Sequence, residues 1–139
     1  MLVDGWWVTP TTVKAVVRHG DSVLLGLNPR QEWELPGGRP EQGEPTIAHT
    51  LERELLEETG LSVTSGRLLL ADLFEVVAGH RLLVVVRLVD LIAGHPGVEP
   101  PVVQGSSEHG ALAWFRYDQL PEPLPEIYGR AIAAAWSPE

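Results

Sequence analysis

The chain has 139 residues, 44% of them hydrophobic, and a formal net charge of -9 at pH 7. This length and composition fit one folded domain with its own core, and they exclude a disordered chain or an array of domains. The excess of acidic over basic side chains, 19 against 10, also argues against binding to a nucleic-acid polymer through a basic surface.

The sequence contains no cysteine, which excludes disulfides, Cys-ligated zinc and thiol catalysis. The N-terminal segment has neither a positively charged region nor a long apolar stretch, so we expect no signal peptide. Apolar runs such as residues 82–86 are far shorter than the roughly 20 residues that span a bilayer. We therefore expect a cytoplasmic protein without a membrane partner.

Two pairs of β-type segments can be read along the chain. Residues 12–18 are rich in Val and Thr, residues 22–27 are mostly apolar, and a short turn-forming tripeptide separates them. Residues 68–77 and 81–92 show the same arrangement. The sequence therefore predicts two β-hairpins.

Between the hairpins, the composition predicts a helix. Residues 46–59 contain no Gly or Pro and are bounded by Pro45 and Gly60, which is typical of a helix. Four apolar residues recur there at helical spacing: Ile47, Ala48, Leu51 and Leu55. One stripe of this helix is therefore expected to pack on a sheet.

The C-terminal third begins with a long segment, residues 93–110, which has three prolines, four glycines and little periodicity. Loops of this length are uncommon in compact domains and are often functional. A short strand at 112–116 and an amphipathic helix at about 125–136 follow. This order predicts a single α/β domain over residues 1–139, with a mixed sheet.

The negative charge is concentrated in one window. Residues 32–58 hold eight of the 14 glutamates and two arginines, Arg39 and Arg53, so the formal charge of this window is -6. The rest of the chain is close to balanced. The predicted helix lies inside this window, so the acidity needs a local explanation.

Three glutamates of the predicted helix, Glu54, Glu57 and Glu58, stand at i, i+3 and i+4 and therefore share one face. Their carboxylates repel one another, and hard divalent cations such as Mg²⁺ or Mn²⁺ would relieve that repulsion. The alternative interpretation is an ordinary solvated helix face with Arg53 as a partial counter-charge. Gly37-Gly38, just upstream, would let the backbone approach a ligand closely, which favours a binding site.

The fixed positions of this window resemble the Nudix box, G-x5-E-x7-R-E-U-x-E-E-x-G-U, where U is aliphatic. The matching residues are Gly38, Glu44, Arg53-Glu54-Leu55, Glu57-Glu58 and Gly60-Leu61, so the box covers residues 38–61. One departure concerns Glu44, which is separated from Arg53 by eight residues where the box has seven. The extra residue displaces Glu44 relative to the helix glutamates.

The resemblance implies an α/β/α sandwich, with the mixed sheet between the box helix and the C-terminal helix. It also implies Mg²⁺-dependent hydrolysis of a pyrophosphate bond in a nucleoside triphosphate or another nucleoside diphosphate linked to a group X. The implied metal site comprises Glu54, Glu57 and Glu58 with Glu44 and Gly38, and Mn²⁺ is a second candidate cation. Arg53 would orient a box glutamate, and Glu57, Glu58 or Glu108 would act as the base.

Two other activities are consistent with the resemblance. One is an ADP-ribose or nucleotide-sugar pyrophosphatase. The other is a Nudix-fold module that binds nucleotides and regulates without cleaving them. The three intact helix carboxylates argue against the second, whereas the extra residue after Glu44 keeps it open.

Several residues outside the box are candidates for contact with the substrate. Arg30 would reach a phosphate, Trp33 would stack on a base, and His109 would touch the substrate, although an exposed or packing role is an alternative for each. For Trp6 and Trp7, we favour packing in the core; covering a sheet edge or meeting the second subunit of a homodimer are the alternatives.

Overall fold

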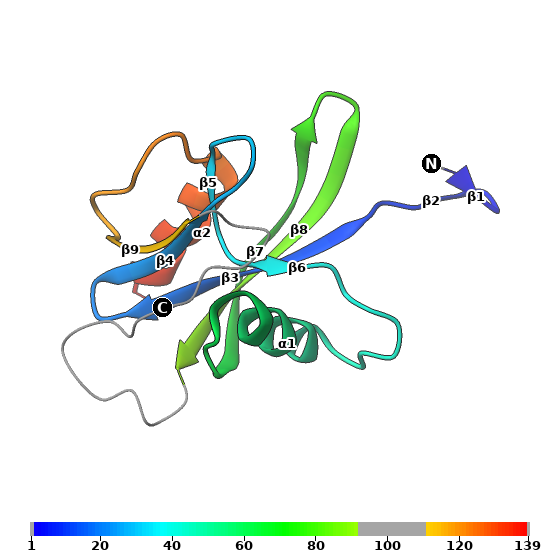
Figure 1. Ribbon diagram of the computed structural model, residues 1–139. Coiled ribbons are helices and arrows are strands. Elements are labelled where there is room, and N and C mark those ends of the chain that lie inside the picture. Colours follow the sequence, from blue (N-terminus) through cyan, green and yellow to red (C-terminus); the bar gives the residue numbers. More distant parts are fainter. Residues whose placement is uncertain (1, 92–110, 139) are drawn as a thin grey trace.

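The computed structural model describes residues 2–91 and 111–138, and within them seven strands form a mixed β-sheet between two helices (Figure 1). The strands are β3 (Thr11–His19), β4 (Ser22–Leu27), β5 (Trp33–Glu34), β6 (Gly37–Gly38), β7 (Val63–Val77), β8 (His80–Leu91) and β9 (Ala111–Arg116). The helices are α1 (Ile47–Thr59) and α2 (Glu126–Trp136). A separate hairpin of β1 (Leu2–Val3) and β2 (Trp6–Trp7) precedes the sheet. The α/β/α sandwich expected from the sequence is confirmed.

The pairing of β3 places the glycine strand β6 beside the middle of the sheet. β3 runs parallel to β8, with Val13 opposite Val85, while β8 pairs with β7 in the antiparallel sense. β3 and β4 pair only beside their turn, at Arg18 and His19. Further along β3, Val13 lies opposite Gly38, because β6 takes the edge that β4 has left. The backbone of β6 is thereby held over α1.

Alternation along β3 distributes its side chains between two cores. Val13, Ala15 and Val17 are fully buried in the cluster that contains Leu51 and Leu55 of α1. Val16 points to the opposite face and belongs to the cluster that includes the apolar side of α2. Successive strand residues face opposite sides of a sheet, so a single strand can contribute to both layers. α1 and α2 therefore cover opposite faces of the sheet (Figure 1).

Two aromatic residues depart from the expectation. Trp6 and Trp7 are 77% and 71% exposed, so the expectation that they pack in the core is wrong. The hairpin that carries them extends away from the sheet (Figure 1), so the core has no surface near enough to cover them. The expected loop at 93–110 lies outside the described residues. No helix within those residues is long and apolar enough to cross a membrane.

Candidate active site

The ends of α1 are fixed by local hydrogen bonds. At the N-terminus, the hydroxyl of Thr46 accepts a hydrogen bond from the backbone N–H of His49 at 3.3 Å. At the C-terminus, Gly60 adopts φ +75°, and its N–H donates to the carbonyl of Leu56 at 3.0 Å. The helix begins and ends as predicted, which fixes the direction in which its glutamates project.

Glu58 lies at the boundary between the acidic face and the core. Leu51 and Leu55 are fully buried, and Glu58, on the edge of the same stripe, is only 3% exposed. A carboxylate in this position needs polar contacts because burial removes its hydration. The backbone N–H of Gly37 donates to Oε2 of Glu58 at 3.3 Å. The buried glutamate is thereby linked to β6.

The backbone of the two glycines of β6 lies very close to neighbouring atoms. A Cβ atom at Gly38 would lie 2.4 Å from the carboxylate of Glu54, so the backbone rests directly on this side chain. Gly37 has φ +144°, and a Cβ there would lie 2.0 Å from the carbonyl oxygen of Val13. Only glycine fits position 37, whereas a side chain at position 38 would displace the carboxylate of Glu54. The glycine pair thus packs the β6 backbone between β3 and the carboxylates of α1.

Arg53 is the centre of the acidic cluster. Its Nη1 lies 2.9 Å from Oε1 of Glu54, 3.3 Å from Oε2 of Glu57 and 3.3 Å from Oε1 of Glu41. Its Nε donates to Oε2 of Glu44 at 2.7 Å, and its Nη2 donates to Oε1 of the same carboxylate at 3.2 Å. One guanidinium therefore contacts four carboxylates and is bidentate to Glu44. A bidentate pair fixes the relative orientation of the two side chains in addition to its charge attraction.

The contacts of Glu44 show how the extra residue is accommodated. Besides its bonds to Arg53, Glu44 accepts hydrogen bonds from the hydroxyl of Thr50 at 2.9 Å and from the backbone N–H of Glu41 at 2.7 Å. The hydrogen bond from Arg53, followed by that from Glu41, lowers the pKa of Glu44 to about 2. The same pairing raises the pKa of Arg53. The insertion does not separate Glu44 from Arg53, and positioning Arg53 is the role that these contacts favour.

The donor set suits a hard divalent cation, since the side chains at the fixed positions of the box offer carboxylate oxygens and neither imidazole nor thiolate. Within the part of the chain that the structure describes, no three acidic or histidine side chains already converge to hold a metal ion. Arg53 lies among the carboxylates instead. The Glu57 side chain is 60% exposed and is therefore able to turn. The assignment of Glu54, Glu57, Glu58, Glu44 and Gly38 to a metal site stays a prediction.

The candidates outside the box have different surroundings. Glu108 and His109 lie outside the described residues. Trp33 packs edge to face on Phe115, with 4.9 Å between the ring centroids. Arg30 forms an ion pair with Glu32 at 3.1 Å and lines a cavity of about 120 Å³. The structure does not bring Trp33 to the carboxylate cluster, and substrate contacts by Arg30 and Trp33 stay predictions.

Sequence reasoning missed two buried titratable residues in that cavity. Lys14 is 8% exposed and Tyr128 is 5% exposed, and both line it together with Glu34. Burial raises the pKa of Tyr128, and the negative charge of Glu34 adds to the effect. The signal for Lys14 was present in the sequence: it is a lysine inside an apolar strand, with the same parity as Val16, which faces α2.

Comparisons with known proteins agree with this arrangement. The sequence model of the NUDIX domain matches residues 8–135. The "Oxidized purine nucleoside triphosphate hydrolase" of Mus musculus is 36% identical over 111 residues, which are 76% of this chain and 65% of that protein. The "8-oxo-dGDP phosphatase NUDT18" of Homo sapiens is 34% identical over 108 residues, which are 75% of this chain and 31% of that protein. The chain thus spans less than two thirds of the length of either relative.

The solved structures include a MutT NUDIX hydrolase from Burkholderia pseudomallei. It is 28% identical to this chain and has a TM-score of 0.70, with coverage of 92% of this chain and 98% of that one. Together with the domain match over residues 8–135 and the carboxylate cluster on α1, this likeness settles the family. The chain belongs to the Nudix hydrolase family.

Proposed function

We propose that this chain hydrolyses a pyrophosphate bond in a nucleoside triphosphate, or in another nucleoside diphosphate derivative, with Mg²⁺ as cofactor. The observation that carries the proposal is the cluster of carboxylates around Arg53, with Glu54 against Gly38 and buried Glu58 against the N–H of Gly37. The printed names of the two relatives, an oxidised purine nucleoside triphosphate hydrolase and an 8-oxo-dGDP phosphatase, support a purine nucleotide as the first substrate to test.

Electrostatics explains why such a site needs a cation. A pyrophosphate is polyanionic, and the segment from residue 32 to 58 carries a formal charge of -6, so the two repel each other. Glu54, Glu57 and Glu58, with Gly38 and Glu44 as further members, would hold the cation. When bound, Mg²⁺ supplies the Lewis acidity that offsets phosphate charge and activates water. Mn²⁺ has the same ligand preference and is the alternative cation.

The protein side chains have separate tasks in this proposal. Arg53 holds Glu44 on one side and Glu54 and Glu57 on the other, so it fixes the spacing of the carboxylates. One of Glu57, Glu58 and Glu108 accepts the proton of the attacking water. Glu58 is held by the N–H of Gly37, whereas Glu57 is exposed and contacts only one nitrogen of Arg53 in the hydrogen bonds that the structure records.

The test is a panel of substrates with Mg²⁺ or Mn²⁺. It contains canonical and oxidised purine nucleoside triphosphates, ADP-ribose, dinucleoside polyphosphates and nucleotide sugars, and products are separated by ion-exchange chromatography. We expect cleavage of at least one nucleotide to a nucleoside monophosphate, and loss of that cleavage in EDTA. Nucleotide binding by calorimetry without cleavage of any substrate would instead favour a binding module and contradict the proposal.

A further inference from the structure

Exposed apolar side chains are concentrated in and beside the N-terminal hairpin. Among the described residues, eight large hydrophobic side chains are exposed, and five of them belong to residues 2–8: Leu2, Val3, Trp6, Trp7 and Val8. The other three lie on α1 and β7. Single exposed apolar residues are normal on a monomer, whereas a contiguous apolar patch marks a contact surface. The hairpin is therefore a surface whose exposure needs an explanation.

The hairpin is apolar on both of its faces. Leu2 lies opposite Trp7, and Val3 lies opposite Trp6, in the pairing of β1 with β2. Directly paired residues point to the same side and the next pair points to the other side, so each face carries one tryptophan. The hairpin pairs with no other strand among the described residues, and an isolated two-stranded hairpin is marginally stable in water. It needs an apolar surface to pack on, and it extends away from its own sheet (Figure 1).

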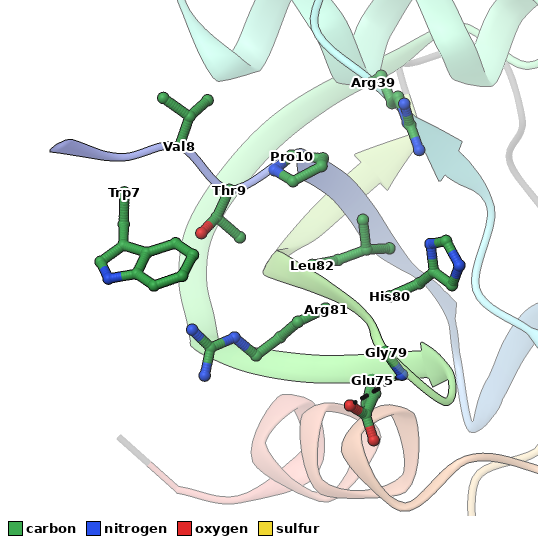
Figure 2. Close-up of a pocket in the computed structure, with 10 residues that line it drawn as sticks. All are labelled: Trp7, Val8, Thr9, Pro10, Arg39, Glu75, Gly79, His80, Arg81 and Leu82. Carbon is green, nitrogen blue, oxygen red and sulfur yellow. Dashed lines mark hydrogen bonds between the residues drawn. The ribbon is translucent and has the colours of Figure 1, made fainter. Parts of the chain in front are cut away.

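A cavity of about 540 Å³ lies between this hairpin and the turn that joins β7 to β8 (Figure 2). Its walls include four apolar side chains and two arginines: Trp7, Val8, Pro10, Leu82, Arg39 and Arg81. The two arginines lie on opposite sides of the cavity, and the guanidinium of Arg81 is on the side of Trp7. Neither arginine side chain forms an ion pair or a hydrogen bond with another residue in the ranges 2–91 and 111–138. The cavity thus combines apolar walls with unpaired positive charge.

The acidic residue at the cavity does not neutralise Arg81. Glu75 lies opposite Arg81 in the pairing of β7 with β8, but its Oε1 accepts a hydrogen bond from the backbone N–H of Gly79 at 3.2 Å. Figure 2 shows the Arg81 side chain extending away from Glu75, toward Trp7. The Arg81 guanidinium is therefore available to a carboxylate from outside this chain.

The hairpin has the charge that complements this cavity. Asp4 is the only charged side chain of residues 2–10, and it lies in the turn between β1 and β2. Its carboxylate has no ion-pair partner among the described residues. Two copies of the chain, each with a formal charge of -9, repel each other in general. Contact between them is favoured where a positive group of one copy meets a negative group of the other.

The size of the apolar surface also suits contact with a second copy. Trp6 and Trp7 are 77% and 71% exposed, which at about 150–250 Å² per large aromatic side chain gives about 300 Å² of apolar surface. Leu2, Val3 and Val8 bring the patch to roughly 400 Å². If each copy buries its hairpin and the cavity wall that receives the other hairpin, each loses about 600–800 Å², and standard interfaces bury about 600–1,000 Å² per partner.

We propose that two copies of this chain form a reciprocal dimer in which the hairpin of each copy enters the cavity of the other. The tryptophans of one hairpin pack on the apolar wall that Pro10 and Leu82 form in the second copy, and Asp4 pairs with the second copy's Arg81. Both halves of this contact use the same residues, so the assembly closes at two copies. The dimer accounts for the exposure of Trp6 and Trp7 in a single chain.

Sedimentation velocity of the full chain over about 1–100 µM protein tests the dimer. We expect the mass to double within this range, and Trp6→Ser and Trp7→Ser each to raise the dissociation constant at least about tenfold, because buried tryptophans dominate interface energies. Leu68→Ser is the matched control, since Leu68 is 55% exposed on β7 and lies outside the cavity. Its dissociation constant should stay within about twofold of wild type. Circular dichroism checks that each variant is folded.

A double-mutant cycle tests the predicted ion pair between Asp4 and Arg81. Asp4→Asn and Arg81→Gln should each raise the dissociation constant about fivefold, and the double variant should be no weaker than the weaker single variant. Asn is suitable because it tolerates the φ of +51° at Asp4. Arg116→Gln is the control: its side chain is 49% exposed, pairs with Asp21 and Asp118 outside the cavity, and should leave the dimer unchanged. Additive effects of the two substitutions would contradict this ion pair.

Two results would overturn the proposal as a whole. One is a wild-type protein that stays monomeric over the whole range, or a dimer whose dissociation constant Trp6→Ser and Trp7→Ser leave within about twofold of wild type. The other is a mass that continues to rise beyond that of a dimer, because a reciprocal contact closes at two copies. Turnover plays no part in these measurements, so their outcome does not depend on the proposed hydrolysis.

Discussion

Gly38→Ala should separate the geometry of the site from the stability of the fold. A Cβ atom at this position would lie 2.4 Å from Cδ and Oε1 of Glu54, whereas ordinary van der Waals contact begins at 3.4 Å. The carboxylate must therefore retreat by about 1 Å. That movement disrupts the 2.9 Å contact between Oε1 of Glu54 and Nη1 of Arg53. A misplacement of about 1 Å in an active site can lower the rate about 100-fold.

The stability cost of the same substitution should be small. The atoms that a methyl group at Gly38 would meet are the end of a flexible side chain, and replacing Gly by Ala also restricts the unfolded chain. We expect the free energy of unfolding to change by no more than about 1 kcal/mol. Gly37→Ala should behave in the opposite way, because its methyl group would meet the backbone carbonyl of Val13 at 2.0 Å and φ is +144°. The free energy of unfolding of Gly37→Ala should be lower than that of wild type by about 3 kcal/mol or more.

The assay combines urea unfolding with steady-state kinetics at saturating Mg²⁺. Gly129→Ala is the matched control, because no atom lies within 4 Å of a Cβ at this position on α2. It should keep full activity and gain up to about 1 kcal/mol from helix propensity. Turnover by Gly38→Ala within twofold of wild type would refute the claim that the backbone of β6 fixes the position of Glu54.

Three further substitutions test other contacts. Arg53→Lys should lower kcat by about tenfold or more with little loss of stability. The reason is that one ammonium group cannot hold Glu44 in a bidentate pair and also reach Glu54. Unchanged kcat would contradict the positioning role of Arg53. Leu55→Ala should lower the free energy of unfolding in urea by about 2–5 kcal/mol, because Leu55 is fully buried where α1 packs on the sheet. A loss below about 1 kcal/mol would argue against that packing. Asp72→Asn should lower the melting temperature by a few degrees at most at pH 7, and the difference should vanish as the pH falls. The N–H of Leu73 and then Arg130 lower the pKa of Asp72. The contribution of Asp72 to stability is therefore present above the ordinary carboxyl pKa and is lost as the pH falls through the lowered value. A difference in melting temperature that grows on acidification would contradict this sign.

The helix and its charged face were predictable because their signals are local. Pro45 and Gly60 bounded the segment, and helical spacing alone placed Glu54, Glu57 and Glu58 on one face. The structure adds Thr46 as the N-terminal cap and shows that Glu58 borders the core. Short-range rules suffice when the partners are within one or two helical turns.

Strand boundaries were harder to predict where the sheet is irregular. β7 starts at Val63, five residues before the expected start at Leu68. Its register against β8 shifts between Ser65 and Leu68 and again before Leu70, which interrupts the alternation that identifies a strand. A side chain from the partner strand stabilises this irregular part: Nε of Arg87 donates to the carbonyl of Gly66 at 2.8 Å. Such a contact has no signature in the sequence of β7 itself.

The contacts between distant segments could not be predicted from the sequence. The box resemblance named Gly38 and Glu54, but only the pairing of β6 with β3 shows why a side chain at Gly38 would collide with Glu54. The cavity formed by Trp7, Arg39 and Arg81 joins three segments that are more than 30 residues apart. Arginine on a surface is common, and only the structure shows which guanidinium groups have no partner among the described residues.

Single Glu→Gln variants of α1 test the central claim most directly. Turnover of the best nucleotide substrate would be measured at saturating Mg²⁺ for Glu54→Gln, Glu57→Gln, Glu58→Gln and the control Glu52→Gln, which makes the same charge change at an exposed position of the same helix. We predict that kcat falls by at least about 100-fold in the first three variants and stays within twofold of wild type in Glu52→Gln. Near-normal kcat in Glu54→Gln, Glu57→Gln and Glu58→Gln would show that these carboxylates are surface charge and would contradict the account.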